Sequence, residues 1–172
     1  IKNQHSISLT LMNLEWQEKK FNILDAPGYL DFHGEVKSAL RVSDLAAIVV
    51  SASDGVMVGN DLVWDYSSKE FETPMMVAIN MCDRDQSNYD SALQSLKDQA
   101  GRAIFPLAMP VDEGEGFSKV IDVLNKKLYT FKTDRSGTYD SSELDDEWTS
   151  KAESLYEELI ELVAESDDTL LE

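Results

Sequence analysis

Alternating apolar and polar residues at the start of the chain predict a β-hairpin. In the stretch SISLTLMNLEW at residues 6–16, every second side chain from Ile7 to Leu11 is apolar, which places these side chains on one face of a strand. The polar stretch QEKK at 17–20 is typical of a turn, and the apolar run FNIL follows at 21–24. Two short strands joined by such a turn pair with each other in the antiparallel sense.

After the hairpin, helical and strand patterns alternate along the chain. The apolar run LAAIVVS at 45–51 is typical of a parallel strand covered on both faces, and MMVAINM at 75–81 has the same character. The stretch SNYD at 87–90 resembles a capping box, which starts a helix. The expected elements are helices at 33–43, 62–71 and 87–101, and strands at 45–51, 75–81 and 102–109. This alternation predicts an α/β fold with a largely parallel sheet and helices on both faces.

The pattern changes after residue 110. Residues 117–131, FSKVIDVLNKKLYTF, are apolar but fit either a helix or paired strands, and both alternatives stay open. Residues 136–146 are polar and rich in turn formers, whereas residues 148–168 have the pattern of an amphipathic helix with glutamates along one face. Three tryptophans lie on apolar faces of the expected elements and are predicted to be in the core: Trp16, Trp64 and Trp148.

Composition and charge narrow the class of protein. The chain has 172 residues, of which 42% are hydrophobic and 28% charged, and its formal net charge is −18. Such acidity argues against nucleic-acid binding through the field of this chain alone, although it does not exclude a ribonucleoprotein partner. The longest apolar stretches are far too short to cross a membrane, and the single cysteine, Cys82, excludes an internal disulfide. We therefore expect a cytoplasmic protein without a membrane partner.

The motif DAPG at 25–28 directly follows the apolar run FNIL and has two interpretations. Asp25, Pro27 and Gly28 are all common in turns, so the motif alone fits an ordinary turn after a strand. An aspartate followed three residues later by a glycine also fits a metal and phosphate sensor, in which a carboxylate and a backbone amide belong to one loop. The motif by itself leaves both interpretations open.

A second motif, NMCD at 80–83, ends another predicted strand. The amide of Asn80 and the carboxylate of Asp83 suit the edge of guanine, because a carboxylate accepts hydrogen bonds from both its N1–H and its exocyclic amine. In parallel sheets, ligands bind beyond the carboxyl ends of the strands, so we expect these residues to converge there with Asp25 and Gly28. The order DxxG, then one strand and two helices, then NxxD is that of a GTPase domain.

These motifs belong to a longer stretch, residues 6–131, that resembles the G domain of translation elongation factor G. DAPGYLDFHGEVKSALRVSDLAAIVVSASDGV is similar to that family from switch II through the next strand, and FETPMMVAINMCDR is similar to its base-recognition strand and loop. The resemblance implies a P-loop-GTPase-like fold that lacks the phosphate-loop strand, with residues 1–110 forming part of the G domain. It further implies that residues 111–172 form part of a small inserted α+β subdomain ending in an amphipathic helix.

The resemblance implies a role for each matching residue. Asp25 would hold Mg²⁺ through a water, Gly28 would offer its amide to the γ-phosphate, and the Ser6 hydroxyl would also bind Mg²⁺. Asn80 and Asp83 would recognise guanine. The implied cofactors are GTP or GDP with Mg²⁺, and the implied partner is the ribosome, contacted through the full-length protein.

Three positions depart from the family pattern. Tyr29 stands where elongation factor G has a histidine that orients the attacking water, and tyrosine is a poor base at neutral pH. Met81 replaces the usual lysine of NKxD, and Gln4 with His5 replaces the usual Arg-Gly before the switch I hydroxyl. Two functions fit this pattern: a factor that hydrolyses GTP for ribosomal translocation or a related step, or a DxPGY-type paralogue that binds nucleotide or ribosome but hydrolyses GTP poorly.

The histidines and the cysteine have no predicted catalytic role. We expect His33 to face solvent or to cap a helix, His5 to lie in a flexible terminus, and Cys82 to be a passive small residue. No cluster of histidine, cysteine and aspartate has the spacing of a zinc site.

No GxxxxGK[ST] sequence occurs in the chain, so nothing in it matches the loop that cradles the α- and β-phosphates. We therefore expect a piece of a longer protein that is inactive alone and binds GTP negligibly. In the family, the strand before that loop lies between the strand ending at Asp25 and the strand at 45–51. These two strands must pair with each other, leave backbone groups open, or recruit a strand from another copy, so we expect the isolated chain to self-associate.

Overall fold

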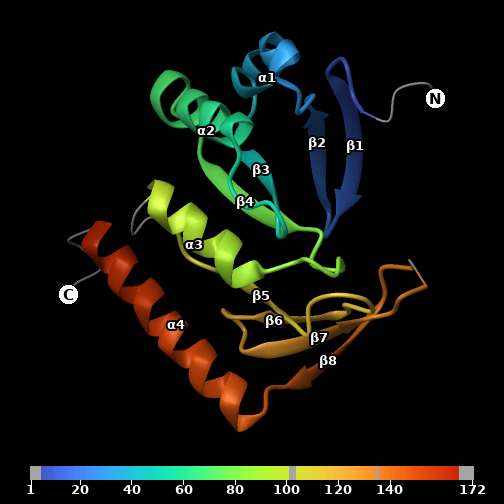
Figure 1. The fold of residues 1–172 in the computed structure, drawn as a ribbon, viewed down its shortest axis with the longest axis vertical. Helices are drawn as coiled ribbons and strands as arrows, with labels where there is room; N and C mark the ends of the chain where they lie inside the picture. The colour runs from blue at the N-terminus through green and yellow to red at the C-terminus, as the bar shows by residue number, and fades with distance from the viewer. Residues whose placement is uncertain (1–4, 101–103, 135, 167–172) are drawn as a thin grey trace. The chain divides into compact units, whose positions relative to one another are not determined.

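Figure 1 shows the fold in the computed structural model. The described residues are 5–100, 104–134 and 136–166. The chain divides into two units, each with its own hydrophobic cluster. The first unit consists of residues 1–50 and 56–78, and the second of residues 51–55 and 79–172.

The predicted hairpin forms in the first unit. Strands β1 (Thr10–Trp16) and β2 (Lys19–Asp25) pair in the antiparallel sense along their full lengths. Gln17 and Glu18 join them with φ angles of 48° and 62°, and two such left-handed residues are typical of the tight turn that matches the twist of a hairpin. The turn is shorter than the predicted four residues because β2 already begins at Lys19.

Two helices supply most of the core of the first unit. They are α1 (His33–Leu40), which follows the short 3₁₀ turn η1 (Leu30–Phe32), and α2 (Val58–Asp65), which continues into the π-helical turn η2 (Tyr66–Glu70). Three buried residues, Val36, Leu40 and Ala46, are packed by Ala26, Val63, Tyr66, Phe71 and Met75. α1 confirms the helix predicted at 33–43, although it ends three residues earlier than predicted.

Strands β3 (Ala46–Ser51) and β4 (Met75–Asn80) form a two-stranded parallel sheet, as predicted. The amide of residue 46 donates to the carbonyl of Pro74 at 2.9 Å, and the amide of Ala52 donates to the carbonyl of Asn80 at 2.8 Å. The two strands therefore advance in the same direction and end together. The structure is thus mixed α/β, with parallel pairing where the sequence alternates between strand and helix.

The prediction that β3 is covered on both faces is wrong. Burial alternates along the strand: Ala46, Ile48 and Val50 are buried, whereas Val49 is 57% exposed. The cluster of the first unit therefore covers one face of β3 only. A continuously apolar run is typical of a strand with two covered faces, but the run itself does not show that another element packs on the second face.

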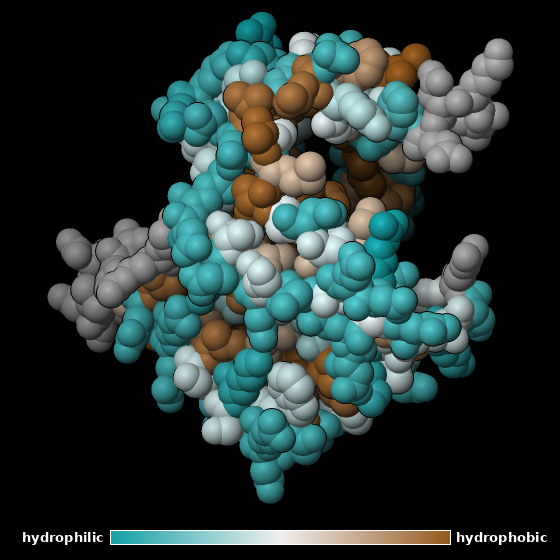
Figure 2. Space-filling view, in the orientation of Figure 1, coloured by the Kyte–Doolittle hydropathy of each residue, from teal (hydrophilic) through white to brown (hydrophobic). Residues whose placement is uncertain are grey.

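β2 and β3 belong to different sheets. Among the described residues, β2 pairs with β1 alone and β3 with β4 alone, so each strand has one edge with open backbone groups. The sequence left three outcomes for these strands, and the structure shows the one in which backbone groups are left open. Self-association of the chain stays a prediction. Phe21 and Ile23 of β2 are 42% and 41% exposed. Figure 2 shows apolar surface around a hollow in the upper part of the view, where Figure 1 places these strands.

The second unit contains an antiparallel sheet with the strand order β5-β6-β7-β8. Its strands are β5 (Ala108–Val111), β6 (Lys119–Asp122), β7 (Lys127–Phe131) and β8 (Tyr139–Glu143). Helices α3 (Tyr89–Ala100) and α4 (Asp146–Ser166) belong to the same unit. α4 confirms the amphipathic helix predicted near the end of the chain, and residues 167 and 168 of that prediction lie outside the described residues.

The pairing of this sheet tests three predictions for residues 102–146. Residues 117–131 contain the paired strands β6 and β7 and no helix. Residues 136–146, predicted as turns, contain β8, whose polar sequence pairs with β7 along its full length. In the stretch 102–109 the strand begins only at Ala108, and it runs antiparallel to β6 instead of closing the parallel series; residues 102 and 103 lie outside the described residues.

One face of this sheet carries the core of the second unit. The buried residues of the cluster are Tyr89 of α3, Met109, Ile121 and Val123, against which Leu93 of α3 and Trp148 and Leu155 of α4 pack. Both helices therefore contact the same face of the sheet.

The three tryptophans have different outcomes. Trp148 packs on the core of the second unit, as predicted. Trp64 is half-buried. Trp16 is 62% exposed at the end of β1, beside the hairpin turn, so its predicted core position is wrong. Alternation along the strand predicts that Trp16 lies on an apolar face, but it does not show whether another element covers that face.

Replacing Ile121 with alanine should destabilise the second unit by about 2–5 kcal/mol, because Ile121 is fully buried and its truncation leaves a cavity in the cluster. Urea unfolding monitored by circular dichroism measures the loss. Ile160→Ala is the matched control: Ile160 is 52% exposed on α4, so its change in unfolding free energy should stay within about 0.5 kcal/mol. Equal losses for the two variants would show that the sheet face around Ile121 is not the core.

Candidate functional site

The first candidate residues, Ser6 and Asp25, are in contact. Asp25 is the last residue of β2 and lies opposite Thr10 of β1. The Ser6 hydroxyl donates a hydrogen bond of 3.0 Å to Oδ2 of Asp25, and both residues are exposed. The structure therefore brings together the two residues for which the sequence implied a shared Mg²⁺ ion.

The oxygen pair has a chemistry that suits Mg²⁺. This ion prefers hard oxygen ligands and usually keeps several bound waters, through which a carboxylate can also hold it. The hydroxyl and carboxylate oxygens of Ser6 and Asp25 are separated by 3.0 Å. Within the described residues no group of three or more histidines, cysteines or carboxylates forms a metal cage, so a Mg²⁺ ion here needs further oxygens from water or from a bound phosphate.

The loop that follows Asp25 leaves space at Gly28. Pro27 is buried, whereas Gly28 is exposed, and a Cβ atom at Gly28 would meet nothing within 4 Å. Gly28 is not among the residues with positive φ, so the loop does not need glycine for its backbone conformation. The backbone of this turn therefore does not require glycine, and the predicted role of the Gly28 amide stays a prediction.

Tyr29 contacts a residue that the sequence analysis assigned to a flexible terminus. The rings of His5 and Tyr29 are 4.4 Å apart between centroids and inclined by 49°. Tyr29 is 56% exposed and precedes the 3₁₀ turn η1. The ring of His5 therefore adjoins the residue at the family's water-orienting position, and the flexibility expected for His5 stays a prediction. No local sequence signal predicts this contact, because the two residues are distant along the chain.

The segment before β1 is also tied to helix α1. The amide of Leu9 donates to Oε2 of Glu35 at 2.7 Å. Together with the contacts of His5 and Ser6, this bond holds residues 5–9 against the loop and helix that follow β2. The role of Glu35 could not be predicted from sequence, since a carboxylate on a helix surface gives no sign that it accepts a hydrogen bond from a remote backbone amide.

Helix α1 is fixed in turn by the π-helical turn η2. His33 Nδ1 and the Tyr66 hydroxyl are 3.2 Å apart, and both residues are half-buried, so the expectation of a solvent-facing or capping His33 is wrong. Lys37 Nζ pairs with Oε2 of Glu70 at 2.6 Å and lies 4.2 Å from the centre of the Tyr66 ring. These contacts position the helix that follows the DAPG loop.

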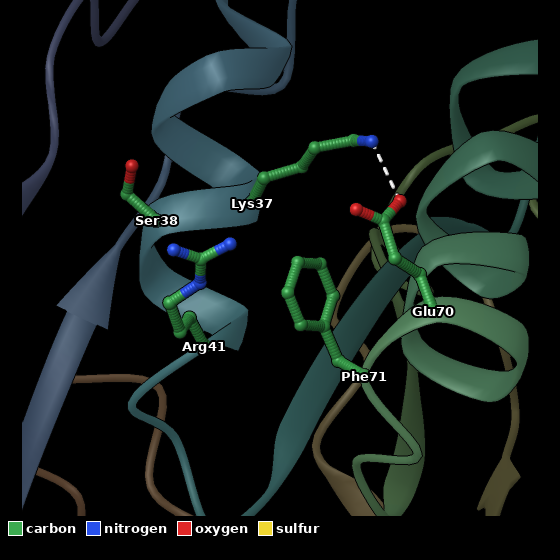
Figure 3. Close-up of a pocket in the computed structure, with 5 residues that line it drawn as sticks. All are labelled: Lys37, Ser38, Arg41, Glu70 and Phe71. Carbon is green, nitrogen blue, oxygen red and sulfur yellow. Dashed lines mark hydrogen bonds and ion pairs between the residues drawn. The ribbon is translucent and has the colours of Figure 1, made fainter.

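A cleft of about 260 Å³ opens between α1 and η2. Figure 3 shows the residues that line it: Lys37, Ser38, Arg41, Glu70 and Phe71. The Lys37 ammonium is already neutralised by Glu70, and the Arg41 guanidinium lies 6.0 Å from the centre of the Phe71 ring. None of the residues predicted to bind nucleotide lines this cleft.

The second pair of candidate residues, Asn80 and Asp83, belongs to the second unit. Both are exposed: Asn80 is the last residue of β4, and Asp83 lies on the loop that follows. Oδ1 of Asn80 accepts a 2.8 Å hydrogen bond from the amide of Met81, whose φ is 64°. Because Asp25, Ser6 and Gly28 belong to the first unit, the predicted convergence of the two motifs stays a prediction.

Several hydrogen bonds hold the loop that contains Asp83. The carbonyl of Cys82 accepts from the amide of Gly114 at 2.8 Å and from the Ser87 hydroxyl at 3.1 Å. Burial raises the pKa of the Cys82 thiol, which disfavours the thiolate and agrees with the passive role expected for it. The loop is therefore anchored through its buried residue, which leaves the neighbouring carboxylate exposed.

The start of α3 differs from the predicted capping box. Oδ1 of Asn88, not the Ser87 hydroxyl, caps the helix by accepting from the amide of Ser91 at 2.9 Å. The amide of Tyr89 donates to Oε1 of Glu113 at 2.8 Å, and the Tyr89 hydroxyl donates to the carbonyl of Ala108 at 3.0 Å. Burial raises the pKa of Tyr89, so its hydroxyl stays a neutral donor.

Comparison with known proteins identifies the protein family to which this chain is similar. A family model described as "Elongation factor Tu GTP binding domain" matches residues 1–166. Elongation factor G of Mycoplasma genitalium is 29% identical over 96% of this chain, and an elongation factor G-like protein of Thermotoga maritima is 31% identical over 96%. A crystal structure of a protein from Thermus thermophilus superposes with a TM-score of 0.86 at 30% identity over 97% of this chain.

The chain spans about a quarter of the length of these proteins. It covers 24% of the Mycoplasma relative, 23% of the Thermotoga relative and 24% of the Thermus chain. In the part of the chain that the structure describes, no helix is both long and apolar enough to span a bilayer.

A matched pair of glycine variants tests whether Gly28 is structural. Gly28→Ala should leave the unfolding free energy of the chain unchanged or raise it by about 0.4–1 kcal/mol, because φ is not positive and the space is open. Gly55→Ala should cost about 1–2 kcal/mol, since Gly55 has a φ of 67° and its added Cβ would lie 3.1 Å from the Ser95 hydroxyl oxygen. Urea unfolding decides between them, and a loss at Gly28 as large as at Gly55 would remove the reason for assigning Gly28 to a ligand.

Proposed function

Because this chain belongs to the family of the elongation factor Tu GTP-binding domain, we propose that it is part of a translational GTPase of the elongation factor G type. In this proposal the full-length protein binds GTP or GDP with Mg²⁺ in the cytoplasm and couples hydrolysis to translocation or to a related step on the ribosome. The chain by itself lacks the phosphate loop, so we expect it to be inactive and to bind GTP negligibly.

The contact between Ser6 and Asp25 beside the open Gly28 is the observation that carries this proposal. Ser6 would hold Mg²⁺ through its hydroxyl, and Asp25 would hold it through a bound water. The Gly28 amide would donate to a γ-phosphate, because Gly28 is exposed and a Cβ atom at this position would meet nothing within 4 Å. When bound, Mg²⁺ supplies positive charge that offsets the charge of the β- and γ-phosphates.

Asn80 and Asp83 are proposed to recognise the base. The Asp83 carboxylate is exposed, and guanine offers it two donors, the N1–H and the exocyclic amine. Hydrogen bonds to a charged acceptor are stronger than neutral ones, so this pair gives most of the preference for guanine. Asn80 is held by the amide of Met81, which fixes the orientation of its side-chain amide.

A second function is favoured by the residues around Tyr29. A phenol is a weak base at neutral pH, and the Tyr29 ring is already in contact with the ring of His5. Met81 has no donor to offer the phosphate-loop region in place of lysine. These features support a paralogue of elongation factor G that binds nucleotide or ribosome but hydrolyses GTP slowly.

Asp83→Asn in the full-length protein should shift the nucleotide preference from GTP toward XTP. An amide cannot accept both donors of guanine, whereas its N–H₂ group suits the additional carbonyl of xanthine. Competition between GTP and XTP for a fluorescent nucleotide measures the shift, which should reach at least about tenfold for the loss of one charge-assisted pair. Asp85→Asn is the matched control, since Asp85 is also exposed near this loop. An unchanged preference for GTP in Asp83→Asn would exclude Asp83 as the base-recognition residue.

Tyr29→His in the full-length protein should accelerate ribosome-stimulated GTP hydrolysis, because imidazole orients and deprotonates water better than phenol near pH 7. Single-turnover release of phosphate measures the rate, and equilibrium binding of GDP serves as the control that should not change. Positioned acid–base groups typically contribute about 10²-fold or more. A rate equal to that of the parent would favour the interpretation that Tyr29 already does this work or that another step limits the rate.

A further inference from the structure

The face of the β5-β6-β7-β8 sheet that α3 and α4 leave uncovered carries an aromatic cluster. It consists of Tyr129 and Phe131 on β7 and Tyr139 on β8, and Phe131 lies opposite Tyr139 in the register. The ring centroid of Tyr139 is 5.1 Å from that of Tyr129 and 5.4 Å from that of Phe131. Leu128, which precedes Tyr129, packs into the core, so the alternation of the strand directs the cluster to the other face.

This aromatic cluster is accessible. Tyr139 is 55% exposed and Phe131 is 39% exposed. Pairs of aromatic rings are usually buried, so rings that contact each other on an open sheet face are unusual. Exposed apolar groups that gather at one place mark interaction surfaces. The core of the second unit does not use these rings, and neither does the proposed nucleotide site.

The cluster adjoins a free strand edge. β8 is the last strand of the sheet, and among the described residues it pairs with β7 alone. All five of its residues are exposed. An edge strand of this kind presents backbone N–H and C=O groups to which an extended segment of another chain can add as a further strand.

The charge of β8 indicates which kind of peptide segment can pair with its open edge. β8 carries Asp140 and Glu143, and the whole chain has a formal net charge of −18. Glu143 meets Lys127 at 3.7 Å but is 83% exposed in its side chain, so the ion pair leaves it open to another cation. A second copy of the chain would bring like charges together along the edge, whereas a basic segment would neutralise them.

We propose that β8 and the aromatic cluster formed by Tyr129, Phe131 and Tyr139 bind an extended basic peptide segment of a partner protein. The segment adds to the sheet beside β8 through backbone hydrogen bonds. Its lysine or arginine side chains lie over the exposed rings of Phe131 and Tyr139 and pair with Glu143, which is on the same face of β8 as Tyr139. This surface is separate in its residues from those proposed to bind guanine nucleotide, so the inference does not depend on the proposed function.

The test uses the 172-residue chain and two fluorescent peptides with alternating residues, acetyl-(Lys-Val)₄-amide and acetyl-(Glu-Val)₄-amide. Fluorescence anisotropy at low salt should show saturable binding of the lysine peptide and none of the glutamate peptide. Hydrogen exchange followed by mass spectrometry should show that the lysine peptide protects the amides of residues 139–143. Binding without that protection, or equal binding of the two peptides, would overturn the proposal.

Three variants distinguish binding at this surface from non-specific attraction of the lysine peptide to the acidic chain. Tyr139→Ala should weaken binding of the lysine peptide about tenfold, as expected for the loss of one partly buried cation–π pair. Glu143→Gln keeps the aromatic cluster, removes the carboxylate on the same face and should also weaken binding. Trp16→Ala, which removes another exposed aromatic residue from a strand of the first unit, should leave binding unchanged. Parental affinity in both Tyr139→Ala and Glu143→Gln, or protection of residues 139–143 by a second copy without peptide, would refute the assignment.

Discussion

Backbone pairing in the first unit stops at β2 and β3, each of which has one open edge among the described residues. The DAPG loop follows directly from the end of β2, so the position of Asp25 depends on a strand that is supported on one side only. A strand between β2 and β3 would fix both at once. Without such a strand, the hairpin partner β1 and the contacts of the loop itself have to hold Asp25 in place.

These contacts connect the segment at residues 5–9 with helix α1. Ser6 binds Asp25, Leu9 binds Glu35 of α1, and α1 is held by η2 through Lys37 and Glu70. A shift of α1 therefore acts on the residues proposed to bind Mg²⁺ through hydrogen bonds that are present without any ligand. Most of them are exposed or half-buried, where single polar contacts contribute little to stability, so this arrangement suits a segment that rearranges when nucleotide binds.

Elements with a strong period could be predicted from sequence, and contacts between distant residues could not. The hairpin, α4 and the parallel strands follow from alternation, helical stripes and apolar runs. FSKVIDVLNKKLYTF fits two periods equally, so only its pairing with neighbouring strands shows that it forms β6 and β7. At the site, family resemblance identified Ser6 and Asp25, whereas the contacts of His5 with Tyr29 and of Glu35 with Leu9 were missed. These contacts join residues that are remote in sequence, and no local pattern records them.

The open strand edges of this chain are of two kinds, and their side chains distinguish them. β2 and β3 carry FNIL and AAIVVS, apolar sequences typical of strands inside a sheet, where exposure to water is unfavourable. β8 carries YDSSE, whose polar and acidic residues are well solvated and discourage pairing between identical chains. The edges of β2 and β3 therefore suit a permanent neighbour within one fold. The edge of β8 is stable in water without a neighbour, which is the condition that a reversible partner of opposite charge requires.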